Sequence, residues 1–137
     1  MNRKGVNSVA VFRCITNNPM ILNSGIPQVE YHETDVLSLF RLIQPEIDKG
    51  YALLSHPLTG SIRPDITPYK TVLLSAQKAK ADQQSLQLID RAIRYAEDLY
   101  SLREKPLYLM WDDQAKKDFQ YGDLSIIRQA MEVEQIR

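Results

Sequence analysis

This chain of 137 residues has only one cysteine and no excess charge of either sign. A single cysteine cannot form an intrachain disulfide. Lysine plus arginine and aspartate plus glutamate each number 17, so the formal net charge is zero. Non-specific binding to nucleic acid or to a membrane surface needs a basic excess, so we expect neither as a partner. Zero net charge leaves little repulsion between copies of the chain, which is compatible with a homodimer.

Long apolar runs and metal-ligand spacings are also absent from the sequence. No stretch approaches the roughly 20 apolar residues of a membrane span, and residues 1–4 are not followed by the apolar segment of a signal peptide. We therefore expect a cytoplasmic protein. The two histidines, His32 and His56, and the single Cys14 are not spaced like metal ligands, so we expect no metal site.

Cys14 lies inside the apolar run Val9–Ile15. A free cysteine in such a run is usually a small buried hydrophobic residue. The alternative is a reactive thiol, which would need an electropositive and partly open environment. We expect the buried role.

Apolar residues alternate between strand-like and helix-like segments. Short runs rich in β-branched and aromatic residues predict strands at Ser8–Ile15, Gln28–Tyr31, Tyr51–Leu54 and Thr71–Leu74. Helical spacing predicts a helix that starts at Thr34 or Asp35 and ends or kinks near Gln44, a second helix over Asp82–Glu104, and a last helix from Asp123 or Ser125 to Gln135. The end near Gln44 is expected because Pro45 lacks an N–H group and clashes with the preceding turn. Leu107–Trp111 reads as a strand or a buried turn, Asp112–Gly122 is ambiguous, and Asp112-Asp113 reads as a helix start rather than a site.

Strands that alternate with helices indicate the α/β class. We expect a single small domain over residues 1–137, with a mostly parallel or mixed sheet of about four strands flanked by helices in Rossmann-like layering. The chain has neither a Gly-x-x-x-x-Gly-Lys-[Ser/Thr] nor a Gly-x-Gly-x-x-Gly motif, so the identity of any cofactor stays open.

The segment Leu54–Tyr69 is a long loop between two of the expected strands. It contains three of the seven prolines, which restrict its backbone, and a loop of this length is usually functional. Gly60 and Ser61 are suited to an anion nest, and Arg63 could grip a carboxylate or phosphate. The alternative is a structural loop in which Arg63 pairs with a nearby carboxylate.

Thr16-Asn17-Asn18-Pro19 follows the first expected strand. Ligands of open α/β sheets gather beyond the carboxyl ends of strands, so these short polar side chains are candidates for ligand contact. An ordinary turn is the alternative interpretation of Asn-Asn-Pro.

The segments Ile15–Pro19 and Leu53–Thr71, in that order and in a chain of this length, resemble the GrdX-like proteins. These are small proteins encoded alongside components of glycine, sarcosine or betaine reductase in anaerobic bacteria that ferment amino acids. The resemblance implies an accessory role near such a reductase and provides no catalytic residues.

We therefore expect an accessory protein that binds a small anionic ligand or a reductase component through the loop at residues 55–70. The alternatives are a small-molecule enzyme that uses His56 as acid–base and Arg63 to orient its substrate, or a purely structural oligomeric protein. The missing nucleophile and cofactor motifs favour a protein that is not an enzyme. The expected ligand-binding residues are Thr16, Asn17, Asn18, Ser55, His56, Gly60, Ser61, Arg63, Thr67 and Tyr69.

Overall fold

A computed structural model describes residues 11–60 and 62–133 of the chain. The elements follow in the order β1 (Phe12–Thr16), η1 (Pro19–Asn23), β2 (Val29–Tyr31), α1 (Val36–Asp48), β3 (Thr71–Ser75), α2 (Gln83–Tyr100), η2 (Leu107–Met110) and α3 (Asp113–Val133). The expected α/β class is confirmed. Residues 8–10 of the first expected strand and residues 134–135 of the last expected helix lie outside the described residues.

The described residues form a mixed sheet of three strands in the order β2-β1-β3. β1 runs parallel to β2, with Cys14 opposite Val29, and antiparallel to β3, with Cys14 opposite Leu73. The carboxyl ends of β1 and β2 therefore meet at one edge of the sheet, where β3 begins.

The expected fourth strand, Tyr51–Leu54, was a wrong prediction. This segment runs beside β3, but only Leu53 forms a bridge, to Leu74. Two backbone bonds of 2.8 Å join the segment to β3, from the Leu54 N–H to the Leu73 carbonyl and from the Ser75 N–H to the Ala52 carbonyl. Serine hydroxyls take two further N–H groups: the Ser55 hydroxyl accepts from the Leu73 N–H at 2.8 Å, and the Ser75 hydroxyl accepts from the Ala52 N–H at 2.9 Å. These side chains satisfy the backbone without a regular strand.

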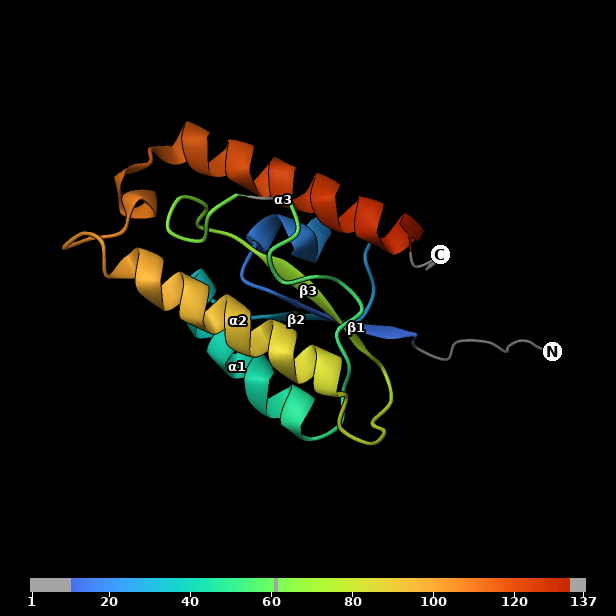
Figure 1. Ribbon diagram of the computed structural model, residues 1–137. Helices are drawn as coiled ribbons and strands as arrows, with labels where there is room; N and C mark the ends of the chain where they lie inside the picture. Colours follow the sequence, from blue (N-terminus) through green and yellow to red (C-terminus); the bar gives the residue numbers. More distant parts are fainter. Residues whose placement is uncertain (1–10, 61, 134–137) are drawn as a thin grey trace.

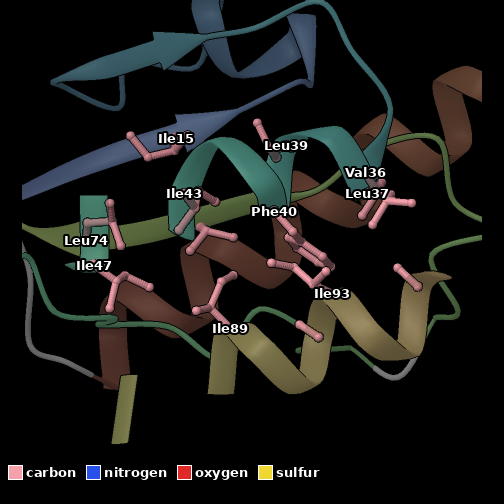
Figure 2. Close-up of a cluster of buried hydrophobic side chains, with 13 residues drawn as sticks. Ile15, Val36, Leu37, Leu39, Phe40, Ile43, Ile47, Leu74, Ile89 and Ile93 are labelled. Atoms are coloured by element: carbon pink, nitrogen blue, oxygen red, sulfur yellow. The ribbon is translucent and has the colours of Figure 1, made fainter. Parts of the chain in front are cut away.

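Helices cover both faces of the sheet, as Figure 1 shows: α1 and α2 lie on one side, α3 and η1 on the other. The α1–α2 side buries Ile15 and Leu74 from the sheet against apolar side chains such as Phe40, Ile43 and Ile89 (Figure 2). The α3 side buries Phe12, Cys14, Ile21, Leu73, Leu124 and Ile127. No helix in the described ranges 11–60 and 62–133 is both long enough and apolar enough to cross a membrane.

The helix α1 continues through Pro45 to Asp48, so the expected end near Gln44 was wrong. Asp35 caps the helix as expected, its carboxylate accepting from the Ser38 N–H at 2.7 Å. Pro45 is exposed, whereas Ile47 one turn later is fully buried. Burial of Ile47 in the core outweighs the hydrogen bond that proline removes. Gly50, with φ of +115°, follows the end of the helix.

The helix α3 is continuous from Asp113, so Asp123 and Ser125 do not cap a separate final helix. The Asp112 carboxylate accepts from the Ala115 N–H at 2.8 Å, which confirms a helix start at this position. Leu107–Met110 is a turn of 3-10 helix rather than a strand. The helix α2 has its N-cap at Asp82 and ends at Tyr100, four residues before the expected Glu104.

Cys14 is completely buried, as expected. Burial, with a smaller effect of the Asp123 carboxylate, raises the pKa of its thiol to about 12. A thiol in this environment stays protonated at neutral pH, which does not fit a reactive cysteine.

Candidate ligand-binding cleft

A cleft of about 570 Å³ opens at the sheet edge where β1 and β2 end and β3 begins. We call it the strand-edge cleft. Its lining comes from five segments of the described chain: Asn17, Pro19, Tyr31, Glu33, Thr34, Asp35, Pro68, Tyr69, Tyr108, Leu109 and Lys116. Open α/β sheets bind their ligands in this position.

The Asn17 side chain joins three of these segments. Its amide nitrogen donates to the carbonyl oxygens of Thr34 at 2.8 Å and Pro68 at 2.9 Å, and its amide oxygen accepts from the Lys70 N–H at 2.8 Å. Both amide protons are therefore in use, and Asn17 is buried. Asn17 thus braces the walls of the strand-edge cleft, and these bonds hold the cleft in shape without a ligand.

The amino end of α1, beside the strand-edge cleft, already carries protein acceptors. The Asp35 carboxylate accepts from the Ser38 N–H, and the Tyr100 hydroxyl accepts from the Leu37 N–H at 3.4 Å. In many α/β proteins these backbone donors hold a phosphate. Here they are satisfied internally, and the Asp35 charge adds repulsion toward an anion.

Two tyrosines of the strand-edge cleft, Tyr31 and Tyr108, lie near carboxylates. Burial and the nearby Glu33 carboxylate raise the pKa of Tyr31. Burial and the Asp35 carboxylate raise the pKa of Tyr108. Burial and nearby negative charge both disfavour the ionised form of a phenol, so both tyrosines stay neutral.

Thr16 and Asn18, two of the expected ligand-binding residues, belong to a buried polar network behind the strand-edge cleft. The Thr16 and Thr71 hydroxyls are 2.7 Å apart. The Asn18 amide donates to an Asp123 carboxylate oxygen at 3.0 Å, and the Thr71 hydroxyl donates to the same oxygen at 2.6 Å. This network connects the last residue of β1 and the first residue of β3 to the middle of α3.

Asp123 and Lys70 are buried charged residues whose importance the sequence prediction missed. Burial raises the pKa of Asp123 and lowers the pKa of Lys70. The Lys70 ammonium donates to the Thr59 carbonyl oxygen, which ties the loop to β3. The position of Asp123 contained a signal, because it is four residues from both Phe119 and Ile127 and so shares their helix face.

Arg63, the expected anion-binding residue, pairs with a carboxylate of its own loop. Its guanidinium donates two hydrogen bonds to Asp65, at 3.0 Å and 2.7 Å. Asp65 is 1% exposed, and the Arg63 hydrogen bonds lower its pKa. This is the structural alternative that the sequence left open for Arg63, and Arg63 is not among the residues that line the strand-edge cleft.

The other loop residues make local contacts. The Ser55 hydroxyl accepts from the Leu73 N–H, the exposed His56 Nδ1 accepts from the Leu58 N–H at 3.0 Å, and the Thr67 hydroxyl donates to the Tyr69 carbonyl oxygen at 3.0 Å. Gly60 has φ of +94° and lies against the side chain of Ile126. Ser61 lies outside the described residues.

Of the ten expected residues, the structure brings Asn17 and Tyr69 together in the lining of the strand-edge cleft. The sequence prediction missed the contribution of residues 31–35. Part of their signal was available, since they lie at and after the end of the expected strand Gln28–Tyr31 and include Glu33 and Asp35. The rule applied to the end of β1 applies equally to the end of β2.

A second hollow, of about 440 Å³, lies between η1 and α3 and is more open to solvent. It is lined by residues such as Met20, Tyr121 and Arg128 and does not reach the strand ends. Within residues 11–60 and 62–133, no three His, Cys, Asp or Glu side chains form a group that could hold a metal ion. The strand-edge cleft is therefore the strongest candidate site.

A family model described as GrdX-like protein matches residues 13–132 of the chain. This match covers most of the sequence, including both segments that carry the resemblance, so the chain belongs to the GrdX-like protein family. No curated protein and no solved structure matches it.

Proposed function

We propose that this member of the GrdX-like protein family is an accessory protein of a glycine reductase system that binds a small molecule in the strand-edge cleft. Family membership supports the association with the reductase system. The observation that carries the binding role is the position of a braced cleft at the carboxyl ends of two parallel strands, with the Asn17 amide joining its walls.

The loop at residues 55–70 contributes to this site through its last part. Pro68 and Tyr69 line the strand-edge cleft, and the Pro68 carbonyl oxygen is one of the Asn17 acceptors. An anion held by Arg63 would have to compete with the Asp65 carboxylate, which already takes two hydrogen bonds from the guanidinium. We therefore place the ligand in the cleft rather than at Arg63.

A binding role fits the cleft better than a catalytic one. His56, the candidate acid–base, is exposed and does not line the cleft. The described lining residues include three tyrosines, two carboxylates and one lysine, with no serine, cysteine or histidine among them. Such a set positions a ligand by contact and charge, and it lacks the Ser–His or Cys–His pair that is typical of nucleophilic catalysis.

The test is nuclear magnetic resonance of the ¹⁵N-labelled protein during titration with small cations, zwitterions, anions and neutral compounds. Binding should shift the backbone amide signals of Asn17, residues 31–35 and Tyr69, and leave those of the α2 N-terminal half, residues 83–90, unchanged. Absence of shifts in this group with every compound class would refute the small-molecule role. If no compound shifts these signals and the protein co-purifies with a reductase component, its role is to bind that component.

A further inference from the structure

We infer that the ligand of the strand-edge cleft is a small ammonium cation, held by the Tyr31, Tyr69 and Tyr108 rings and by the Glu33 and Asp35 carboxylates. This inference rests on the proposed function, because it names the chemical class of the molecule that the same cleft takes. It goes against the anionic ligand that the loop sequence predicts.

The first argument is the composition of the lining. Three tyrosines from three different segments, β2, the loop before β3, and η2, converge on one cleft with two carboxylates. Aromatic rings attract cations through their negative faces, and sites for quaternary ammonium groups combine several such rings. Tyr31, Tyr69 and Tyr108 are all half-buried, so water competes only partly for the bound cation.

The second argument is the sign of the charge. Glu33 and Asp35 contribute two negative charges against the single positive charge of Lys116, which leaves one net negative charge in the lining. Among residues 11–60 and 62–133, neither Glu33 nor Asp35 takes part in an ion pair. The Glu33 carboxylate is thus available to a cationic ligand, and Asp35 adds its negative charge while one of its oxygens caps α1 by accepting from the Ser38 N–H.

The third argument is that the donors best suited to bind an anion are already hydrogen-bonded within the protein. At the amino end of α1, the N–H groups of Leu37 and Ser38 are taken by Tyr100 and Asp35. The guanidinium of Arg63 is taken by Asp65 and is not part of the cleft. An anion entering the strand-edge cleft would meet Lys116 as its one charged partner and two carboxylates in opposition.

The experiment compares choline with 3,3-dimethylbutan-1-ol, its neutral isostere, by isothermal titration and by the amide shifts described above. We expect choline to bind at least about fivefold more tightly, the size of one partly shielded cation–π contact. Tetramethylammonium should shift the same amides, whereas acetate and phosphate should not.

Two pairs of variants locate the effect. Glu33→Gln removes an exposed carboxylate of the cleft and should weaken choline binding about threefold or more. Glu132→Gln is the control and should leave choline binding unchanged, because Glu132 is exposed and lies at least four turns along α3 from Lys116. Tyr31→Phe keeps the ring and should bind choline as the wild type does, whereas Tyr31→Leu should weaken binding. The Phe variant also controls for folding at this strand position.

The outcomes separate the two proposals. Equal binding of choline and its neutral isostere, or binding of acetate or phosphate in preference to choline, would overturn the ammonium inference while the cleft remained a ligand site. Absence of binding by every compound would overturn the proposed small-molecule function itself. Choline binding that is weakened equally by Glu33→Gln and Glu132→Gln would place the cation outside the cleft and overturn the inference.

Discussion

The Asp123 carboxylate in the middle of α3 accepts hydrogen bonds from both the hydroxyl and the backbone N–H of Thr71 at the start of β3, at 2.6 Å and 3.1 Å. These residues are 52 positions apart in the sequence. The contact buries the Asp123 carboxyl group at the start of β3, where it holds α3 against the sheet.

Replacing Asp123 with alanine should lower the free energy of unfolding by about 2–4 kcal/mol. The Thr71 N–H, the Thr71 hydroxyl and the Asn18 amide would lose their acceptor in a buried environment, and such unsatisfied donors are costly. Urea denaturation measures the loss. Asp118→Ala, at an exposed position on the same helix, is the matched control and should change stability by less than about 0.5 kcal/mol. Equal effects of the two substitutions would contradict the role of the buried network.

The stability of the protein should depend on pH through Asp123 in a direction opposite to most carboxylates. Burial raises the pKa of Asp123 above its ordinary value of 3.8, so the folded state binds this proton more tightly than the unfolded state. The resulting stabilisation is complete below pH 3.8 and is lost as the pH rises through the folded-state pKa. The difference in unfolding free energy between wild type and Asp123→Asn should therefore fall with rising pH, by at most about 1.4 kcal/mol per unit. Urea titrations from pH 4 to pH 8 on both proteins measure it, and a difference that rises with pH would refute the prediction.

Replacing Arg63 with alanine should lower the melting temperature more at pH 7 than at pH 3. The Arg63 hydrogen bonds lower the pKa of Asp65, so their stabilisation is present above the unfolded-state pKa and is lost as the pH falls through the folded-state pKa. At pH 7 the variant leaves a buried carboxylate without its main partner. Differential scanning calorimetry at both pH values measures the effect. In an Asp65→Asn background the same substitution should matter less, and an unchanged effect there would show that Arg63 acts through other contacts.

Replacing Pro45 with alanine should stabilise the protein by about 1–3 kcal/mol. Pro45 is exposed inside α1, where it supplies no N–H to the Arg41 carbonyl and crowds the preceding turn. Alanine restores the hydrogen bond without disturbing the buried side chains Ile43 and Ile47. Thermal and urea denaturation measure the gain, with Asp48→Ala in the last turn as a helix-surface control. A loss of stability would mean that the Pro45 ring makes a contact worth more than the missing hydrogen bond.

Apolar periodicity in the sequence predicted α1, α2, the second half of α3 and three strands, because a buried face imposes its own repeat. The apolar stripe of α1 consists of Val36, Phe40, Ile43 and Ile47. Ile47 extends this stripe beyond Pro45, where the helix was expected to end but continues. The strand expected at Tyr51–Leu54 failed for a different reason. Its apolar side chains pack as those of a strand would, but the hydroxyls of Ser75 and Ser85 take the N–H groups of Ala52 and Leu53.

The sequence was less informative about the candidate site because hydrogen-bond partners depend on the tertiary structure. Thr16 and Asn18 have the short polar side chains expected of ligand-binding residues. In the structure the Thr16 hydroxyl is hydrogen-bonded to the Thr71 hydroxyl, and the Asn18 amide donates to the Asp123 carboxylate. Arg63 has the chemistry of an anion clamp, yet Asp65, two residues later, occupies it. No local sequence pattern distinguishes a hydrogen-bond donor that is available to a ligand from one that is already bonded within the protein.

The sequence by itself determined the α/β class, the burial of Cys14 and the polar character of the segments that follow β1 and β2. Those properties depend on composition and on short-range periodicity, which a linear chain displays directly. Only the tertiary structure decided that Asn17 would join Thr34 and Pro68, that Asp123 would be buried against Thr71, and that three tyrosines would line one cleft. These relationships join residues that are 17 or more positions apart, and their geometry is set by how the helices pack against the sheet.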